Sequence, residues 1–294
     1  MLSILIPTYN YNIFPLVQEL HEQCIQQKII FEIIVLDDCS IKFHTENNKT
    51  NTLSNCIYQI LNQNIGRSAI RNLLATKATF TNLLFLDADV RLINKQFIKN
   101  YLSFIQYNSN YEVVYGGIVY QENQPETNQL LRWIYGNERE ALSAEKRNEN
   151  VYVSFLTLNF LIKKDVFAKV KFNEEIPNLR YEDLLFSYDL MKNKVLLQHI
   201  NNQVVHNGIE TSEFFLQKTN DSLKGLQFLL ENNYLPADYS KLTAIYKLLK
   251  QTHLLWIVNL LYKSFKTKFK KNLLGSKPSL FIYDIYRLGY FSKL

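Results

Sequence analysis

Leu83-Leu84-Phe85-Leu86-Asp87-Ala88-Asp89 is the stretch that decides the fold of this chain. Its four leading apolar residues are typical of a strand buried on both faces, as in a parallel sheet. Residues i and i+2 of an extended chain point the same way, so we expect Asp87 and Asp89 to converge. Converging carboxylates repel each other unless a cation lies between them, and their oxygen atoms suit Mg²⁺ or Mn²⁺. The alternative is a strand-end turn with solvated acids, or an aspartate that caps a helix.

Two earlier stretches have the same arrangement of an apolar run followed by polar residues. Leu2–Ile6 is almost continuously apolar and ends at the turn Pro7-Thr8-Tyr9-Asn10. Ile33–Leu36 is a second buried run, and Asp37 and Asp38 follow it directly. Each of the three runs therefore reads as a buried strand with polar residues at its carboxyl end.

Apolar residues at helical spacing lie between these runs and complete a β-α-β-α-β order. The helices are expected over residues 14–27 and 66–78. This order predicts an α/β domain with a mostly parallel central sheet flanked by helices. Ligands of such sheets bind beyond the carboxyl ends of the strands, so we expect the three polar strand ends to share one site.

Periodicity and turn signals predict the remaining elements. They are a loop over 42–55, a helix over 95–106, a strand over 112–115, an extended segment over 151–162, a helix over 184–191, a strand over 204–206 before the turn Asn207-Gly208, and a helical region from 211 to about 271.

Composition restricts the class of protein. Of the 294 residues, 47% are hydrophobic and only 8 are glycine and 6 proline, which argues against a disordered or linker-rich chain. The three cysteines, Cys24, Cys39 and Cys56, have no metal-ligand spacing, so we expect a reducing compartment. No basic leader precedes the first strand, and no apolar run reaches the roughly 18 residues of a spanning helix. These features predict a cytoplasmic protein, or one at the inner face of the cytoplasmic membrane.

Positive charge is concentrated in the C-terminal region. The chain has a net charge of +6, and residues 247–294 hold nine Lys and one Arg against a single acid, Asp284. An apolar run that contains Trp256 leads there into a lysine-rich segment that ends at Lys271. Such a basic tail can lie as a helix on an anionic membrane surface. The alternative is a helix packed on the rest of the chain, with a solvated basic end.

Five motifs occur in an order that closely resembles family 2 glycosyltransferases, whose catalytic domain has the GT-A fold. They are Ile6-Pro7-Thr8-Tyr9-Asn10, Val35-Leu36-Asp37-Asp38-Cys39-Ser40, Asn64-Ile65-Gly66-Arg67 with Ala69-Ile70-Arg71-Asn72, Phe85-Leu86-Asp87-Ala88-Asp89 and Tyr181-Glu182-Asp183. Each motif alone is weak, but five in this order are specific. The resemblance implies a GT-A nucleotide-sugar-binding catalytic domain over residues 1–210. A helical C-terminal region with a basic tail would follow over residues 211–294.

The resemblance implies how a nucleotide-sugar donor is bound. The turn Pro7-Thr8-Tyr9-Asn10 would line the base and ribose, and Asp38 would accept a hydrogen bond from the base. Asp87 would contact the ribose or the donor sugar. Arg67 and Arg71 share a helix face near a helix N-terminus, where cations are unfavourable unless an anion is present. That anion is either the donor diphosphate, which we expect for Arg67, or a nearby carboxylate such as Asp87 or Asp38.

The resemblance also implies a metal site. Asp89 would bind Mn²⁺ or Mg²⁺, and His206 matches a histidine that completes the metal site in many such enzymes. A neutral imidazole would suit Mn²⁺ better than Mg²⁺. The alternative is an ordinary histidine before a turn.

Asp183 would be the catalytic base. It lies in the first turn of an expected helix, whose N-terminus stabilises its anionic form. A carboxylate that is ionised at neutral pH can take a proton from a sugar hydroxyl as that oxygen attacks. Glu182 beside it would bind the acceptor. The alternative is an ordinary pair of acids at a helix start.

Gln129-Leu130-Leu131-Arg132-Trp133 has the Q-x-x-R-W pattern of processive polysaccharide synthases. In those enzymes the pattern follows the acid motif and accompanies transmembrane helices, whereas here it precedes Asp183. We therefore expect an amphipathic helix near the acceptor. Arg132 and Trp133 would either touch the acceptor or pack against the protein.

The resemblance implies an inverting glycosyltransferase that moves a sugar from a nucleotide-diphosphate sugar, with UDP-sugar the expected donor, to a hydroxyl group. The acceptor would be a glycan or a lipid-linked molecule of polysaccharide or cell-envelope glycan biosynthesis, and no nucleic acid partner is expected. One alternative is a sugar-phosphate nucleotidyltransferase, which needs a Gly-rich loop where Pro7-Thr8-Tyr9-Asn10 stands. Another is a non-catalytic sugar-binding protein on a GT-A scaffold, against which the intact set of acids argues.

Overall fold

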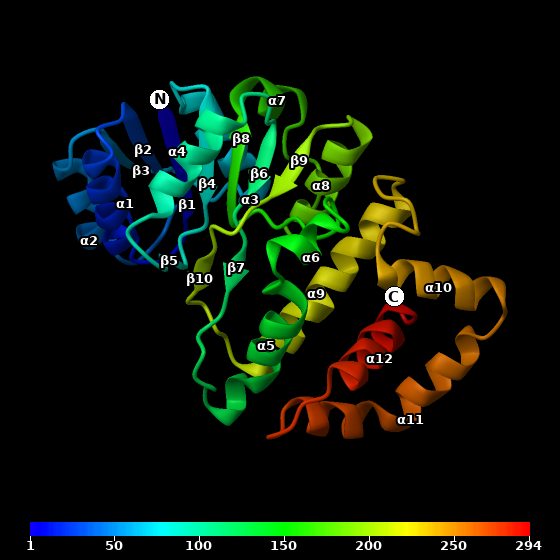
Figure 1. Cartoon of the computed structure of the whole chain (residues 1–294). Coiled ribbons are helices and arrows are strands. Elements are labelled where there is room, and N and C mark those ends of the chain that lie inside the picture. Colours follow the sequence, from blue (N-terminus) through cyan, green and yellow to red (C-terminus); the bar gives the residue numbers. More distant parts are fainter. The chain divides into compact units, whose positions relative to one another are not determined.

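The structure, a computed structural model, describes all 294 residues and divides into two compact units (Figure 1). Unit 1 consists of Met1–Val119, Ala141–Glu174 and Glu182–Gly208. Unit 2 consists of Tyr120–Glu140, Glu175–Tyr181 and Ile209–Leu294. The chain thus passes more than once between the units, and the domain boundary at residue 210 stays a prediction.

The main sheet of unit 1 has seven strands in the order β3-β2-β1-β4-β8-β6-β9. They are β1 (Leu2–Thr8), β2 (Phe31–Asp37), β3 (Cys56–Ile60), β4 (Asn82–Leu86), β6 (Val113–Tyr115), β8 (Asn159–Lys163) and β9 (Leu197–His199). Strands β1 to β4 run parallel, and only β8 is antiparallel to its neighbours. The register pairs Thr8 with Asp37, so the carboxyl ends of β1 and β2 are level. The predicted α/β class with a mostly parallel sheet is confirmed.

Helices cover both faces of this sheet (Figure 1). The helices of unit 1 are α1 (Phe14–Gln26), α2 (His44–Asn48), α3 (Arg67–Lys77), α4 (Phe97–Tyr107), α6 (Ala144–Asn148), α7 (Lys164–Lys169) and α8 (Glu182–Lys192). Phe85 of β4 shares a buried cluster with Leu74 of α3 and Phe186 of α8. Successive strand residues point to opposite faces, so Leu84 points away from this cluster. Helices α1 and α4 are joined by Gln23, whose Oε1 accepts a hydrogen bond from the backbone of α4 at 3.1 Å.

A second sheet of unit 1 has three short strands in the order β5-β10-β7. They are β5 (Val90–Leu92), β7 (Ile118–Val119) and β10 (Val204–His206). Strand β10 is antiparallel to β5, and their register pairs His206 with Val90. This pairing brings His206 next to the residue that precedes Val90, which is Asp89.

Two predictions for unit 1 were wrong in detail. The predicted loop over 42–55 contains α2 and a 3₁₀ helix, η1 (Lys49–Thr52), because the Asn47 side chain bonds the backbone of Tyr11 and Ile13 at 2.9 Å each. These hydrogen bonds join residues that are far apart in the sequence, so no local sequence pattern indicates them. Of the extended segment over 151–162, only the part within β8 is a strand, and residues 151–158 form turns and coil.

Unit 2 is helical. Its elements are η2 (Thr127–Gln129), α5 (Leu130–Tyr135), the π-helical turn η3 (Gly136–Glu140), α9 (Ser212–Glu231), α10 (Lys241–Gln251), α11 (Leu255–Leu273) and α12 (Leu280–Phe291). Its buried cluster includes Phe215, Tyr262 and Tyr286. A Cβ atom at Gly289 would lie 2.5 Å from the Tyr262 ring, so only glycine allows α11 and α12 to pack this closely. The predicted helical region is present, but breaks at 232–240 and 252–254 divide it. No helix combines the length and the apolar character that crossing a membrane requires.

Candidate active site

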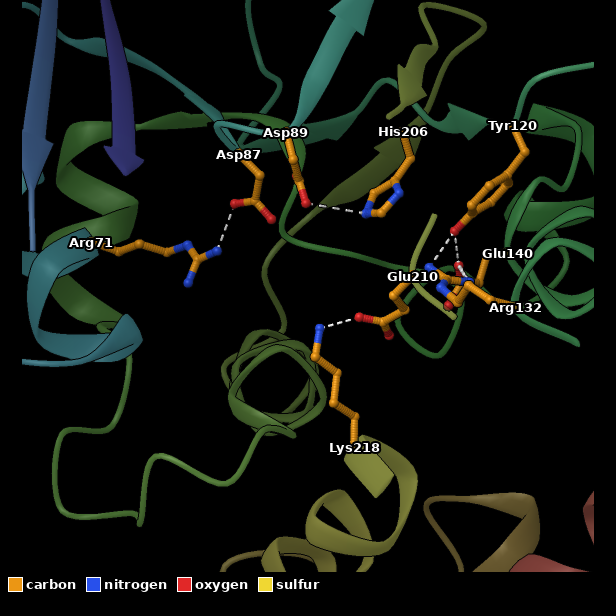
Figure 2. A network of polar contacts seen from close by, with 9 residues as sticks. All are labelled: Arg71, Asp87, Asp89, Tyr120, Arg132, Glu140, His206, Glu210 and Lys218. Atoms are coloured by element: carbon orange, nitrogen blue, oxygen red, sulfur yellow. Dashed lines mark hydrogen bonds and ion pairs between the residues drawn. The ribbon is translucent and has the colours of Figure 1, made fainter. Parts of the chain in front are cut away.

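The turn between β4 and β5 carries Asp87 and Asp89, and it directs them to different partners (Figure 2). Asp87 Oδ1 accepts a hydrogen bond from Arg71 Nη2 at 2.7 Å, whereas Asp89 Oδ2 lies 3.5 Å from His206 Nε2. Strand β4 ends at Leu86, so the two acids stand in a turn and not on an extended chain, and their convergence on one cation stays a prediction. The two acids are still electrostatic neighbours: burial raises the pKa of Asp87, the positive charge of Arg71 opposes the rise, and Asp89 adds to it.

Asp89 and His206 fit the predicted metal site. One carboxylate oxygen and one imidazole nitrogen form a donor set that suits Mn²⁺. Space for a ligand here depends on Gly208, because a Cβ atom there would lie 2.8 Å from Asp89 Oδ2. No group of three or more His, Cys, Asp or Glu side chains is arranged to hold a metal. A metal at this pair would therefore need further ligands from a substrate or water, and the metal roles of both residues stay predictions.

Two residues beside Asp89 were not predicted as part of the site. The Asn207 backbone N–H donates to the carbonyl oxygen of Asp89 at 2.9 Å, and the Asn207 side chain bonds the Tyr11 hydroxyl. Burial raises the pKa of Tyr11, and the charge of Asp89 adds to the rise. Tyr11 directly follows the predicted turn that ends at Asn10, and the sequence predicts for Asn207 only a place in the turn Asn207-Gly208. Their position next to Asp89 depends on contacts between distant segments.

Helix α3 places two arginines among acids from other elements. Arg71 is buried, and its Nη1 lies 4.0 Å from Glu182 Oε1 in addition to the bond between Nη2 and Asp87. Arg67 Nη1 lies 3.4 Å from the same oxygen of Glu182, but the Arg67 side chain is 44% exposed. The anion near Arg71 is therefore a carboxylate of the protein, which was one of the two alternatives for this arginine. The guanidinium group of Arg67 remains accessible to a further anion.

Asp38 binds the N-terminus of α3. Its two carboxylate oxygens accept hydrogen bonds from the backbone N–H groups of Ile65 at 2.7 Å and Gly66 at 3.0 Å. Gly66 has a φ of 83°, a value that L-residues rarely adopt, so glycine is favoured at this entry to the helix. Each carboxylate oxygen has a second lone pair. The contact of Asp38 with a base therefore stays a prediction that its geometry allows.

The turn after β1 lies against the loop that follows β2. The Asn10 backbone N–H donates to Ser40 Oγ at 2.7 Å, and Asn10 Oδ1 accepts from the N–H of Ile41 at 2.9 Å. Thr8 is buried and its hydroxyl oxygen has no hydrogen-bond partner within the protein, whereas Tyr9 is 55% exposed. The structure thus offers a buried polar atom and an exposed ring at a strand end. The nucleotide-binding role of Pro7, Thr8, Tyr9 and Asn10 stays a prediction.

Asp183 lies in the first turn of α8, as predicted, and its Oδ1 accepts a hydrogen bond from the Leu184 N–H at 2.8 Å. Burial raises the pKa of Asp183 to about 6, and the charge of Glu182 adds to the rise. The Leu184 N–H group and the two arginines oppose it. Burial therefore outweighs the stabilisation that the helix N-terminus gives to the anionic form. At neutral pH the carboxyl group is still mostly ionised.

Together these groups carry more negative than positive charge. Arg67 and Arg71 interact with Asp87, Glu182 and Asp183, and Asp89 acts on Asp87. We call these six residues the acidic cluster. Four carboxyl groups face two guanidinium groups, so two negative charges are left over when all are ionised. This excess suits a divalent cation and disfavours the cluster in its absence.

Arg132 and Trp133 belong to unit 2, where both have partners within the protein, and Figure 2 shows those of Arg132. Arg132 donates to Glu140 Oε2 at 3.0 Å and to the Tyr120 hydroxyl at 2.6 Å, and its guanidinium carbon lies 5.3 Å from the centre of the Phe215 ring. Trp133 Nε1 donates to the carbonyl oxygen of Gln121 at 2.8 Å. These contacts agree with the alternative in which Arg132 and Trp133 pack against the protein. Contact of either residue with an acceptor stays a prediction.

Comparison with protein families gives one match. A family described as glycosyl transferase family 2 matches residues 3–170, which is more than half of the chain. The matched part includes Asp38, Asp87 and Asp89, whereas Asp183 and His206 lie beyond it. No curated protein matches the sequence.

Several solved structures have a similar fold. S. aureus TarS 1–349 in complex with UDP-GlcNAc matches with a TM-score of 0.51 and 20% identity, over 76% of this chain and 66% of that one. The mannosyltransferase PcManGT from Pyrobaculum calidifontis, in complex with GDP-Man and Mn²⁺, matches with a TM-score of 0.54 and 13% identity, over 78% and 64%. S. aureus TarS matches at 0.52 and 18%, over 98% and 54%, so this chain spans about half of its length. These similarities confirm the GT-A fold.

Proposed function

Since this chain belongs to glycosyl transferase family 2, we propose that it moves a sugar from a nucleotide-diphosphate sugar to the hydroxyl group of an acceptor, with inversion at the anomeric carbon. The observation that carries this proposal is the acidic cluster of unit 1. Acids that follow β4 and begin α8 meet there around Arg71, at distances of 2.7 Å to Asp87 and 4.0 Å to Glu182. An excess of carboxyl groups can hold the divalent cation that binds a diphosphate at the strand ends of such a sheet.

The donor would lie along the carboxyl ends of β1, β2 and β4. Tyr9 is exposed there and Asp38 has free lone pairs, which supports their assignment to the base and ribose. Arg67 would contact the diphosphate, because its guanidinium group is more exposed than that of Arg71. Asp87 would contact the ribose or the sugar through the oxygen that Arg71 does not occupy.

Asp89 and His206 would hold Mn²⁺ or Mg²⁺, and the imidazole nitrogen favours Mn²⁺. When bound, such an ion supplies positive charge where the leaving diphosphate becomes more negative. The positioning of these ligands would depend on residues around them. Asn207 holds the backbone of Asp89, and Gly208 leaves the space beside its carboxylate.

Asp183 would act as the general base. The acceptor oxygen attacks the anomeric carbon while the bond from that carbon to the diphosphate oxygen breaks, and the hydroxyl proton passes to Asp183. The nucleoside diphosphate leaves, and the product has the inverted configuration. A pKa of about 6 suits this role, because the group is ionised at pH 7 yet basic enough to accept a proton in the transition state.

The acceptor would be a glycan or a lipid-linked molecule of polysaccharide or cell-envelope glycan biosynthesis. The Glu182 carboxylate already binds Arg67, so Glu182 would influence acceptor binding through that arginine and not by direct contact. Arg132 and Trp133 stay candidates for contact with the acceptor. Because their polar groups already bond within unit 2, they would contact it through the other atoms of their side chains.

The proposal is tested by measuring donor binding and donor turnover separately. UDP-GlcNAc and GDP-Man are suitable first probes, because they are the ligands of the TarS and PcManGT structures. We expect one nucleotide sugar to raise the melting temperature in the presence of Mn²⁺ and to release nucleoside diphosphate slowly when water replaces the acceptor. Pyrophosphate release from a nucleoside triphosphate and a sugar phosphate would instead indicate a nucleotidyltransferase. Binding without any turnover would indicate a non-catalytic sugar-binding protein.

A further inference from the structure

Helix α11 buries few of its apolar side chains. Of its 19 residues only Tyr262 and Leu273 are buried, and both belong to the buried cluster of unit 2. By contrast, Trp256 is 63% exposed and Leu260 is 55% exposed. The exposed large apolar side chains of α11 and the residue before it are Leu254, Trp256, Ile257, Leu260, Leu261 and Phe265. Packing within unit 2 does not account for these side chains.

The same part of the chain is strongly basic. From Lys241 to Leu273, through α10 and α11, there is no Asp or Glu and there are eight lysines, all exposed. They are Lys241, Lys247, Lys250, Lys263, Lys266, Lys268, Lys270 and Lys271. Five of the eight lie in α11. We call these five lysines and the six exposed apolar side chains the tail face.

Apolar and charged residues are separated along the tail face. Five of the six exposed apolar side chains lie at or before Leu261, and four of the five lysines follow Phe265. Lys268 is exposed, and its Nζ lies 5.3 Å from the centre of the Phe265 ring, so the two kinds of side chain meet within the tail face. A helix with a tryptophan-containing apolar part and an unopposed basic part is typical of proteins that bind the interface of a bilayer.

We propose that the tail face binds the anionic surface of a phospholipid bilayer, with Trp256 and Leu260 in the interfacial region and the lysines at the headgroups. Charge complementarity selects this occupant. A second copy of the chain would bring two sets of lysines together without any acid on the face to pair with them. A nucleic acid would satisfy the lysines but leave the aliphatic side chains exposed to water. An anionic bilayer satisfies both kinds of side chain.

The proposal is tested by co-sedimentation of the full chain with vesicles of phosphatidylcholine alone and with 30% phosphatidylglycerol, a composition chosen for the test. We expect binding to the anionic vesicles only, weakening as NaCl is raised. Each lysine near the surface contributes about 1 kcal/mol, so Lys266→Ala/Lys270→Ala should weaken binding by about 30-fold at low salt. Trp256→Ser/Leu260→Ser should also abolish most binding. Neither pair is part of the acidic cluster, so binding is measured independently of sugar transfer.

Matched controls come from unit 1. Lys77→Ala/Lys99→Ala removes two exposed lysines, and Ile93→Ser/Tyr107→Ser removes two exposed large side chains. Both control variants should bind as the unmodified chain does. The proposal is overturned if the chain binds neither kind of vesicle at low salt, or if the tail-face variants bind like the controls. It is equally overturned if light scattering shows a dimer that Trp256→Ser/Leu260→Ser dissociates, because the face would then be a contact between two copies.

Discussion

Arg71 of unit 1 and Arg132 of unit 2 are both buried guanidinium groups that bond a carboxylate, at 2.7 Å and 3.0 Å. Their surroundings differ. Arg132 has one acid, Glu140, and the Tyr120 hydroxyl completes a closed set of hydrogen bonds. Arg71 lies among acids that outnumber the arginines, and one of its partners, Asp87, is 32% exposed.

This difference separates a structural ion pair from a binding site. In a balanced, fully hydrogen-bonded pair such as Arg132 with Glu140, no charge is left over for a ligand to neutralise. An unbalanced set of carboxyl groups is unfavourable by itself. Burial is the main cause of the raised pKa values of Asp87 and Asp183, and the neighbouring acids Asp89 and Glu182 add to the rise. A ligand that brings positive charge would remove it. The predictions below test whether the two arginine sites differ in this way.

The largest effect is expected for Asp183→Asn. If Asp183 is the base, sugar transfer should fall by about 10³-fold, while the donor still binds in the presence of Mn²⁺. Transfer is measured as nucleoside diphosphate release, and binding by calorimetry. Asp189→Asn, on the same helix but outside the acidic cluster, is the matched control and should retain activity. Loss of donor binding in Asp183→Asn would remove Asp183 from the role of base.

The second effect concerns stability. Arg132→Met leaves Glu140 partly buried without its cation, so the free energy of unfolding should fall by about 3 kcal/mol. The double variant Arg132→Met/Glu140→Gln should recover most of that loss, because the unpaired charge is gone. Arg71→Met should cost less stability, since Asp87 is partly exposed, but more activity. Urea unfolding gives the stabilities, and the comparison fails if the two single variants lose equal amounts of both.

Third, Asp89→Ala should remove the dependence of donor binding on Mn²⁺ and weaken that binding by about 100-fold. Chelation of metal with EDTA should have the same effect on the unmodified chain and no effect on the variant. Asp221→Ala, which changes a half-exposed acid of unit 2, is the control. If EDTA leaves donor binding unchanged, the metal assignment of Asp89 and His206 is wrong.

The smallest effect is expected from pH. Because the raised pKa of Asp183 is about 6, a base at this position is progressively protonated as pH falls through that value. The ratio kcat/KM should then fall about tenfold for each pH unit below 6 and stay level above it. Residual activity of Asp183→Asn should lack this limb. A limb at pH 4, the range of an ordinary aspartate, would indicate that burial does not raise the pKa in this way.

Much of unit 1 was predictable because its signals are local. Buried strands such as Leu83–Leu86 are uninterrupted apolar runs, and the polar residues at their ends stand next to them in the sequence. The bond between Arg71 and Asp87 was one of two alternatives that helix geometry left open. The second sheet was not predicted as a sheet, because β5 and β7 have three and two residues and carry no periodicity of their own.

The environment of individual groups was less predictable. Tyr11 and Asn207 meet beside Asp89 although nearly two hundred residues separate them in the sequence. The direction of the Asp183 pKa shift depends on how deeply its helix start is buried, which the motif alone does not express. The exposure of Trp256 and Leu260 likewise depends on which face of α11 the aromatic cluster of unit 2 covers.

By itself the sequence determined the buried strands β1, β2 and β4 with the helices α1 and α3, the positions of the strand-end acids and the basic character of the C-terminal region, because each follows from residues that are neighbours along the chain. Only the tertiary structure decided which carboxyl group bonds Arg71, that His206 faces Asp89, and that burial outweighs the helix N-terminus at Asp183. These depend on charges and surfaces brought together from distant segments, and electrostatic energies change with every group within a few ångströms.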